Sequence, residues 1–286
     1  MKLIRYPTAE AFLTAVEPTL MADEAKNNLI LGIAGQVAVG RSYGEGQPYF
    51  LSVHDEDRVV AAAIRTPPYN VILYCDPDRR DALERIADHL LDEGEQLPGA
   101  HGTVDIVGAF AETWTARTGR AARVSMSQRV YCLTEVTAPV DVPGRMRWAE
   151  EQDVPTLAKW FLGFIQEAVP EDPPADPEAN VRRFMSRGAL GVWETDHIVS
   201  MAGSSRGSKN GSTVSAVYTP RENRGKGYAS ACVAALSQAM LDAGSAFCTL
   251  YTDLSNPTSN KIYQNVGYQP VADFAMYEFT EPGGNA

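Results

Sequence analysis

The chain has 286 residues, of which 44% are hydrophobic and 21% charged, so it can build packed cores and is not a disordered polypeptide. Its formal net charge of −11 argues against non-specific nucleic-acid binding, because a phosphate backbone would repel it. The four cysteines and four histidines lack metal-ligand spacing, so neither a metal site nor a disulfide framework is expected. Without a signal-peptide pattern or a membrane-length apolar run, the expectation is a soluble cytoplasmic protein with no membrane partner.

The first half of the chain predicts strands and helices in alternation. In some segments its apolar residues alternate with polar ones, as in a strand, and in others they recur every three or four residues, as in a helix. The predicted elements are a strand at 3–5, a helix at 11–16, a strand, turn and strand over 50–64, a strand at 71–74, a helix at 78–92, a strand at 103–107 and closing strands.

The same order of elements returns roughly 140 residues later. The second half predicts a strand at 146–148, a helix at 154–168, an exposed loop at 169–177, a short helix ending at Gly188, paired strands over 190–203, a strand at 213–219, a helix at 228–243 and a strand at 246–253. This repeat predicts a mixed α/β fold with two tandem domains, 1–140 and 145–286, joined by a linker at 139–144.

A glycine-rich loop joins a predicted strand to a predicted helix in the second half. The loop is Arg221-Glu-Asn-Arg-Gly-Lys-Gly227, and Pro220 before it ends the strand because proline cannot donate to a sheet ladder. A glycine-rich turn that leads into a helix presents free backbone N–H groups and the positive end of the helix dipole. Arg224 and Lys226 add positive charge to an otherwise acidic chain. The loop therefore predicts a ligand that carries phosphate.

Two common phosphate-binding loops match this segment poorly. A Walker loop needs Ser or Thr after Gly-Lys, whereas Gly227 follows Lys226. A dinucleotide-binding Gly-x-Gly-x-x-Gly is half present, since Gly225 and Gly227 fit but Ser230 replaces the third glycine. Asp253 ends the next predicted strand, where a ribose-binding acid would lie, so the dinucleotide alternative remains open.

The loop and a downstream segment together resemble a known family. Arg224-Gly-Lys-Gly-Tyr-Ala229 resembles the [Gln/Arg]-x-x-Gly-x-[Gly/Ala] acyl-CoA loop of the GNAT superfamily of N-acyltransferases. Asn256-Pro-Thr-Ser-Asn-Lys-Ile-Tyr-Gln-Asn-Val-Gly-Tyr268 resembles the Asn-x-x-[Ala/Ser]-x-x-x-Tyr-x-x-x-Gly-[Phe/Tyr] segment of that family. The resemblance spans roughly residues 145–281. The first half has Cys75-Asp-Pro-Asp-Arg-Arg80 at the equivalent of the loop, and so resembles a degenerate copy that cannot hold CoA in the usual way.

The resemblance implies where an acyl-CoA molecule would bind. In the family it lies where two neighbouring parallel strands diverge, here the strands ending at Thr219 and Asp253. The loop would hold the diphosphate, and the strand end would hold the pantetheine arm. The implied acyl donor is acetyl-CoA, with no metal. The implied binding residues are Val217, Tyr218, Thr219, Arg224, Gly225, Lys226, Gly227, Tyr228, Ala229, Ser230, Asn256, Asn260 and Tyr263.

The resemblance also implies a catalytic role for Tyr263. A phenol with a reference pKa of about 10 can donate a proton to a departing thiolate. Apolar Ile262 and Val266 flank Tyr263, so its ring also packs in the core. The alternative is that its hydroxyl group only meets a backbone carbonyl.

A general base is harder to identify. Many family members place a glutamate in the strand that corresponds to 213–219, and this strand contains no acid. Glu167 is the candidate catalytic base and Glu194 the other option, although exposed glutamates are common as solvated charges. Acids in the loop 171–178 could attract a cationic acceptor.

These observations predict an N-acetyltransferase that moves an acetyl group from acetyl-CoA to a primary amine of a small molecule or peptide, by direct attack in a ternary complex. The missing strand glutamate keeps open an alternative from another class, a non-catalytic module that binds or senses acyl-CoA. The acceptor, the role of the first half and the oligomeric state do not follow from the sequence.

Overall fold

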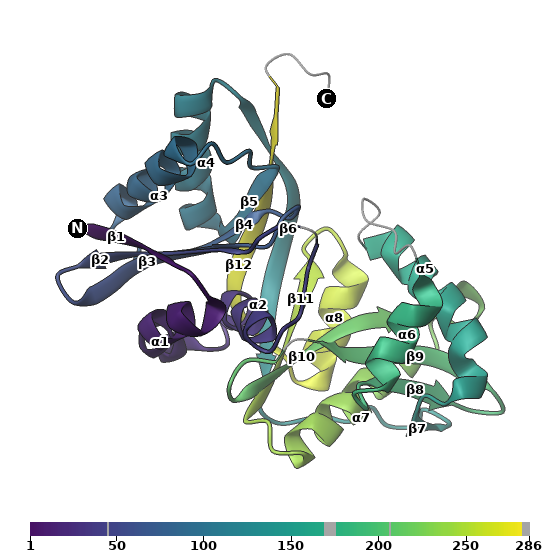
Figure 1. Cartoon of the computed structure of the whole chain (residues 1–286). Coiled ribbons are helices and arrows are strands. Elements are labelled where there is room, and N and C mark those ends of the chain that lie inside the picture. The colour runs from purple at the N-terminus through teal and green to yellow at the C-terminus, as the bar shows by residue number, and fades with distance from the viewer. Residues whose placement is uncertain (45, 169–175, 206, 282–286) are drawn as a thin grey trace. The chain divides into compact units, whose positions relative to one another are not determined.

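The chain divides into two compact units. A computed structural model describes residues 1–44, 46–168, 176–205 and 207–281 (Figure 1). Unit 1 comprises Met1–Arg129 and Ala272–Ala286, and unit 2 comprises Val130–Val271. Each unit is a mixed β-sheet flanked by helices, which confirms the predicted fold class.

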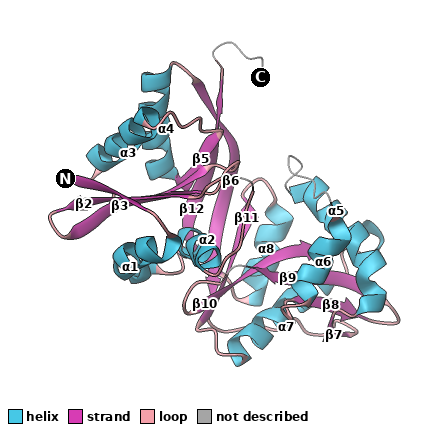
Figure 2. Cartoon of the chain, in the orientation of Figure 1, coloured by secondary structure: helices cyan, strands magenta, loops and turns pink. Residues whose placement is uncertain are grey.

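Unit 1 contains a sheet in the order β1-β2-β3-β4-β5-β12-β6, in which β4 and β5 are parallel. Helices α1 and α2 cover one face of this sheet, and α3 and α4 cover the other (Figure 2). Its elements are β1 (Lys2–Tyr6), α1 (Ala9–Leu20), α2 (Asn28–Ala38), β2 (Tyr49–Asp55), β3 (Arg58–Arg65), β4 (Val71–Cys75), α3 (Arg80–Asp92), β5 (Gly99–Thr103), α4 (Val104–Thr118), most of β6 (Ala121–Leu133) and most of β12 (Gln269–Thr280).

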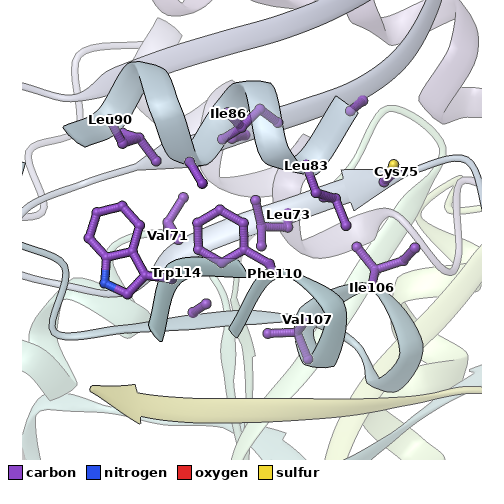
Figure 3. Close-up of a cluster of buried hydrophobic side chains, with 14 of the residues drawn as sticks. Val71, Leu73, Cys75, Leu83, Ile86, Leu90, Ile106, Val107, Phe110 and Trp114 are labelled. Atoms are coloured by element: carbon purple, nitrogen blue, oxygen red, sulfur yellow. The ribbon is translucent and has the colours of Figure 1, made fainter. Parts of the chain in front are cut away.

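The core of unit 1 follows from helical spacing. Leu83, Ile86 and Leu90 recur at intervals of three and four residues in α3, so they share one buried face. Phe110 and Trp114 of α4 stack at a centroid distance of 5.9 Å and pack in the same cluster (Figure 3). This packing fixes α3 and α4 on the sheet face that β4 and β5 share.

Unit 2 has the strand order β6-β11-β10-β9-β8-β7, with β10 and β11 parallel. Helices α7 and α8 share a core on one face, and α5 and α6 pack on the other. Its elements are β7 (Arg145–Trp148), α5 (Val154–Ala168), α6 (Pro177–Met185), β8 (Leu190–Glu194), β9 (Ile198–Ser205), β10 (Gly211–Tyr218), α7 (Tyr228–Asp242), β11 (Phe247–Asp253) and α8 (Pro257–Val266).

Two strands continue from one unit into the other. The end of β6 belongs to unit 2, and most of β12, the last strand of the chain, belongs to unit 1. There β12 pairs antiparallel with β5, from Phe274 opposite Thr103 to Glu278 opposite Gly99. This division differs from the predicted ranges 1–140 and 145–286, because a repeat in the sequence shows the order of elements but not which sheet a strand joins.

Two helices of unit 1 differ from the sequence prediction. Residues 104–118 form α4, whereas a strand was expected at 103–107 because valine and isoleucine are frequent there. Ile106, Phe110 and their neighbours instead bury one helical face, and tertiary packing outweighs local propensity. Helix α2 lies in a segment with no predicted element.

Membrane-spanning helices and metal-binding clusters are two features that the described residues lack. None of the helices in these ranges has the length and apolar character that a membrane-spanning segment requires. Within the same ranges, His, Cys, Asp and Glu side chains do not form groups of three that could hold a metal ion.

Cys75, Cys232 and Cys248 are buried free thiols, and burial raises the pKa of each to about 12. They stay protonated at neutral pH and are poor nucleophiles.

An ion pair between half-buried Arg147 and buried Asp153 anchors the start of α5. Arg147 on β7 binds both carboxylate oxygens of Asp153 at 2.6 and 2.9 Å. Asp153 also accepts the Glu150 N–H at 2.8 Å just before α5. Burial opposes the charge on Asp153, but these hydrogen bonds hold its pKa below the usual range.

We expect Asp153→Asn to lower the free energy of unfolding by about 3–5 kcal/mol at pH 7, because it leaves the Arg147 charge without its main partner. Urea denaturation measures this loss, and Glu151→Gln, on an exposed pair, should cost under about 1 kcal/mol. Because the Asp153 pKa is lowered, the wild-type contribution is lost only as the pH falls through that lowered value. Equal losses in both variants would contradict an anchoring role.

Candidate functional site

The candidate site of unit 2 begins where β10 and β11 diverge. The two strands pair in parallel only from Gly211 opposite Phe247 to Thr213 opposite Thr249. Beyond that point β10 contains a bulge, with a register shift on β9 between Ser215 and Tyr218. Ala216 at the bulge has a φ of 49°, which is unusual for a residue other than glycine.

The bulge frees backbone groups at the end of β10. Ala216 and Val217 have no partner residue in the described β9 register. The end of the strand is fixed from the other side, because the buried Ser200 hydroxyl donates to the Tyr218 carbonyl and shares a 2.8 Å hydrogen bond with the Thr219 hydroxyl. The backbone of Val217 thus lacks a partner residue at the opening between the strands, whereas the Tyr218 and Thr219 carbonyls and the Thr219 side chain are bonded to protein groups.

The glycine loop has the conformation that its glycines predict. Gly225 and Gly227 have φ values of 78° and 82°, in the left-handed region that favours glycine. Gly227 is the N-cap of α7 and provides no side chain to cap the helix. The first intrahelical bond runs from the Ala231 N–H to Gly227, so the N–H groups of Tyr228, Ala229 and Ser230 precede the helical ladder. The start of α7 therefore presents N–H groups of the kind that bind anions at helix N-termini.

Arg224 is held in place by neighbouring groups. Its Nε donates to the Thr219 carbonyl at 2.8 Å, and its guanidinium lies 5.6 Å from the ring centroid of Tyr218. Its outer nitrogen binds both carboxylate oxygens of Glu167 at 2.9 and 2.8 Å. Arg224 therefore ties the loop to the end of α5. Lys226, by contrast, is exposed and forms no ion pair with a described residue.

Helix α8 starts just after β11 and is capped by Asn256. The Asn256 side chain accepts the Ser259 N–H at 3.1 Å, with Pro257 in the first turn. Asn260 donates to the carbonyls of Asp253 and Asn256 and accepts the Tyr131 hydroxyl. Both asparagines thus set the position of α8, and the Asn260 amide is engaged with protein groups.

Tyr263 lies on α8 in the core of unit 2. Its ring packs edge-on against Tyr268 at a centroid distance of 6.1 Å, and burial raises its pKa to about 12. The Tyr268 hydroxyl is bonded to Ser237 at 2.8 Å, whereas the Tyr263 hydroxyl bonds to no described residue. Of these two buried tyrosines, only Tyr263 keeps its hydroxyl available to a ligand.

Comparisons with known proteins agree with this geometry. Residues 189–276 match the family model described as FR47-like protein, while none of the curated proteins matches the chain. A GNAT-family acetyltransferase from Colwellia psychrerythraea is 10% identical with a TM-score of 0.61, over 98% of this chain and 100% of that one. A tandem GNAT protein from the clavulanic acid biosynthesis pathway is 14% identical with a TM-score of 0.58, over 100% of both chains. The chain has the tandem GNAT fold. A GCN5-related N-acetyltransferase from Sphaerobacter thermophilus shares this fold. It is 16% identical with a TM-score of 0.61, over 99% of this chain and 98% of that one.

The candidate bases of unit 2 are both engaged in ion pairs. Glu167 binds Arg224, as described above. Glu194 accepts Arg147 Nε at 2.8 Å. Of the acidic loop 171–178, residues 171–175 lie outside the described residues. Asp176 caps α6 by accepting the Ala179 N–H at 2.9 Å. The base therefore stays a prediction.

Sequence reasoning missed the packing of Tyr218. A Cβ built on Gly163 of α5 would lie 2.6 Å from the Tyr218 hydroxyl oxygen, so only glycine lets the phenol lie against the helix. A glycine inside an otherwise apolar helix was the available signal. The bulge at Ala216 had no signal, because alanine does not indicate a left-handed backbone.

Proposed function

We propose that unit 2 is an N-acetyltransferase that moves the acetyl group of acetyl-CoA to a primary amine of a small molecule or peptide. The observation that carries this proposal is the start of α7, which has no side-chain cap and follows the left-handed Gly225 and Gly227. The strand before this loop, β10, bulges out of register with β9. Tyr263, with a free hydroxyl, lies on the helix that follows the other diverging strand.

The residues present fit an acyl donor that carries a diphosphate. A Cβ on Gly225 meets no atom within 4 Å, so the backbone there is open to a ligand. N–H groups at the start of α7, together with Lys226, would hold the diphosphate. Backbone groups at Val217 and Thr219 would bind the amide-bearing arm of the donor. Acetyl-CoA supplies an acetyl group activated as a thioester.

The proposed chemistry uses few side chains. A backbone N–H freed by the bulge would stabilise the charge that develops on the acetyl oxygen when an amine attacks. Tyr263, protonated because of its raised pKa, would give its proton to the sulfur as the carbon–sulfur bond breaks, and the proton that the attacking amine loses, passed through solvent, would restore the phenol. Cys232 and Cys248 are buried thiols with a pKa of about 12, which favours direct transfer over a cysteine-bound intermediate.

Substitution of Glu167 separates two roles. As the partner of Arg224, Glu167 competes with a diphosphate for this arginine, so Glu167→Gln should tighten acetyl-CoA binding by up to about fivefold and leave kcat within about twofold. With Glu167 as the general base, the same substitution should instead lower kcat by about 10²-fold. Calorimetry gives the affinity and a thiol assay gives kcat, with the exposed Glu151→Gln as control.

The proposal is tested by release of free CoA from acetyl-CoA with a panel of primary amines. We expect at least one amine to raise the rate of release well above hydrolysis. The alternative, a non-catalytic acyl-CoA-binding module, is favoured by two observations: β10 lacks an acid, and both Glu167 and Glu194 are paired. Saturable acetyl-CoA binding without turnover across the panel would support that module, and binding of NADH in place of acetyl-CoA would support the dinucleotide alternative.

A further inference from the structure

Unit 1 contains a cavity where β4 and β5 diverge. These strands pair in parallel only at Val71 opposite Ala100 and Ile72 opposite His101. Beyond this point a cavity of about 290 Å³ opens between the end of β4 and the start of α4, with α2 and β12 forming its other walls. It occupies the position in unit 1 that the β10–β11 opening occupies in unit 2.

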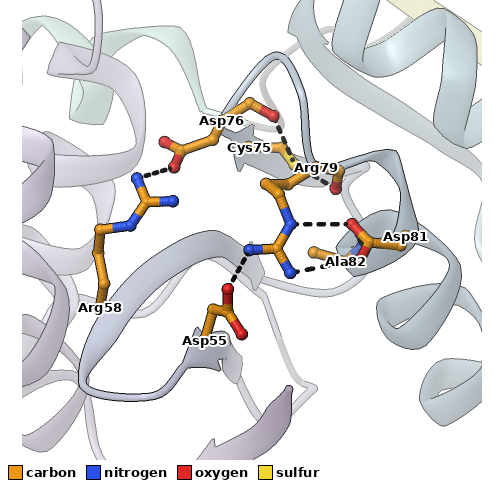
Figure 4. A network of polar contacts seen from close by, with 7 residues as sticks. All are labelled: Asp55, Arg58, Cys75, Asp76, Arg79, Asp81 and Ala82. Atoms are coloured by element: carbon orange, nitrogen blue, oxygen red, sulfur yellow. Dashed lines mark hydrogen bonds and ion pairs between the residues drawn. The ribbon is translucent and has the colours of Figure 1, made fainter.

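The segment between β4 and α3, which corresponds in chain order to the glycine loop of unit 2, carries carboxylates in place of glycines. The segment after β4 has no glycine, and Arg79 there binds Asp55 at 2.6 Å and Asp81 at 3.2 Å (Figure 4). Arg58 binds Asp76 at 2.6 Å. Asp55, Asp76 and Asp81 thus lie around the start of α3 and pair with Arg58 and Arg79, while Arg80 forms no ion pair with a described residue. These carboxylates disfavour the binding of a diphosphate here.

The interior of the cavity is apolar and unreactive. Ile30, Ile72, Leu73 and Phe274 form much of its wall. Cys75 also lines the cavity, but its thiol donates to two backbone carbonyls and burial raises its pKa to about 12. These features suit the binding of a small apolar body rather than a reaction.

Two opposite charges complete the lining. Lys26 precedes α2 and Asp105 lies in the first turn of α4, so the charges come from separate walls. Neither forms an ion pair with a described residue. The third charged group, Asp273, is already neutralised by Arg129 through bonds of 2.6 and 2.8 Å. Among the described lining residues, Lys26 and Asp105 thus place opposite charges beside an apolar wall, an arrangement complementary to a zwitterion.

We propose that this cavity binds a small hydrophobic α-amino acid, with the carboxylate at Lys26, the ammonium at Asp105 and the side chain against the apolar wall. Its volume is at the lower limit of ligand pockets, which suits a single amino acid. The site is independent of the acetyl-CoA site proposed for unit 2.

The test uses the full chain with L-leucine and L-phenylalanine as probes, in calorimetry and thermal shift. We expect saturable binding by at least one of them, and binding at least tenfold weaker for isopentylamine, isovalerate and glycine, each of which lacks one of the three features. Lys26→Met and Asp105→Asn should each raise Kd at least tenfold. Glu112→Gln, an exposed change on the same helix, should leave Kd unchanged.

Three results would overturn the proposal: no saturable binding of either amino acid, wild-type affinity in both Lys26→Met and Asp105→Asn, or displacement of the amino acid by acetyl-CoA. Arg224→Glu distinguishes the two sites. It should abolish acetyl-CoA binding and leave the amino-acid affinity intact, so failure of the acetyltransferase proposal would not hide the outcome here.

Discussion

Replacement of Tyr263 by phenylalanine should lower kcat by about 10²-fold or more while acetyl-CoA Kd stays within about twofold. The ring stays packed against Tyr268, so only the hydroxyl that would protonate the departing sulfur is lost. Free CoA release under saturating amine gives kcat, and calorimetry gives Kd. Because no described residue bonds to this hydroxyl, its removal leaves no broken hydrogen bond in the described core.

Tyr268→Phe is the matched control for this substitution. Its hydroxyl is committed to Ser237, so the variant should lose stability but keep kcat within about threefold after correction for folded protein. Equal losses of kcat in both variants would reduce Tyr263 to a packing role, and unchanged turnover in Tyr263→Phe would remove it from the mechanism.

The raised pKa of Tyr263 gives a pH test of the same role. A phenol with a pKa of about 12 stays protonated through pH 10, so the ratio of wild-type to Tyr263→Phe kcat should be constant from pH 7 to pH 10. A tyrosine with the reference pKa of about 10 would lose its proton over the upper part of this range, and the ratio would fall. A falling ratio would show that Tyr263 ionises in the working enzyme.

Gly227→Asp and Arg224→Glu should each abolish stabilisation by acetyl-CoA. At a ligand concentration of 100 times Kd, wild type should gain about 2.7 kcal/mol, seen as a rise in Tm. At Gly227, with φ of 82°, a Cβ would be strained and lie 3.0 Å from a Val142 methyl, and the new carboxylate would stand at the start of α7. Arg224→Glu replaces the loop cation by an anion beside Glu167.

Two substitutions elsewhere in unit 2 control for strain and charge. Gly188 also has a left-handed φ, 59°, with no atom within 4 Å of a built Cβ, so Gly188→Asp adds strain without an anion site. Arg182→Glu removes an exposed arginine that pairs with Glu151 and Glu178. Both should keep the full rise in Tm. A normal rise in Gly227→Asp and Arg224→Glu would exclude this loop as the diphosphate site.

The sequence predicted the elements of the candidate site well, because each rests on local signals. The helix expected at 228–243 is α7 at Tyr228–Asp242, and the strand expected at 246–253 is β11 at Phe247–Asp253. The cap at Asn256 and the left-handed Gly225 and Gly227 follow from residue chemistry alone. These features depend on neighbours within a few residues.

What the sequence could not predict depends on distant partners. The pair between Arg224 and Glu167 joins residues 57 positions apart, and neither residue type indicates the other. Residues 104–118 form helix α4 because this conformation buries their apolar side chains on one face. The bulge at Ala216 depends on how β10 pairs with β9. In each case tertiary contacts outweigh the local preference.

The position of β12 has a consequence for how the chain is made. A ribosome releases a chain from its N-terminus, and domains generally fold in that order. Here β5 emerges early, whereas β12, its partner in unit 1, follows the described elements of unit 2 in the chain. Until β12 has been synthesised, the edge of β5 that pairs with it therefore presents unpaired backbone groups, the kind of strand edge that promotes aggregation. Unit 1 completes its sheet only after unit 2 has been synthesised, and a nascent chain stalled before β12 would be a substrate for chaperones.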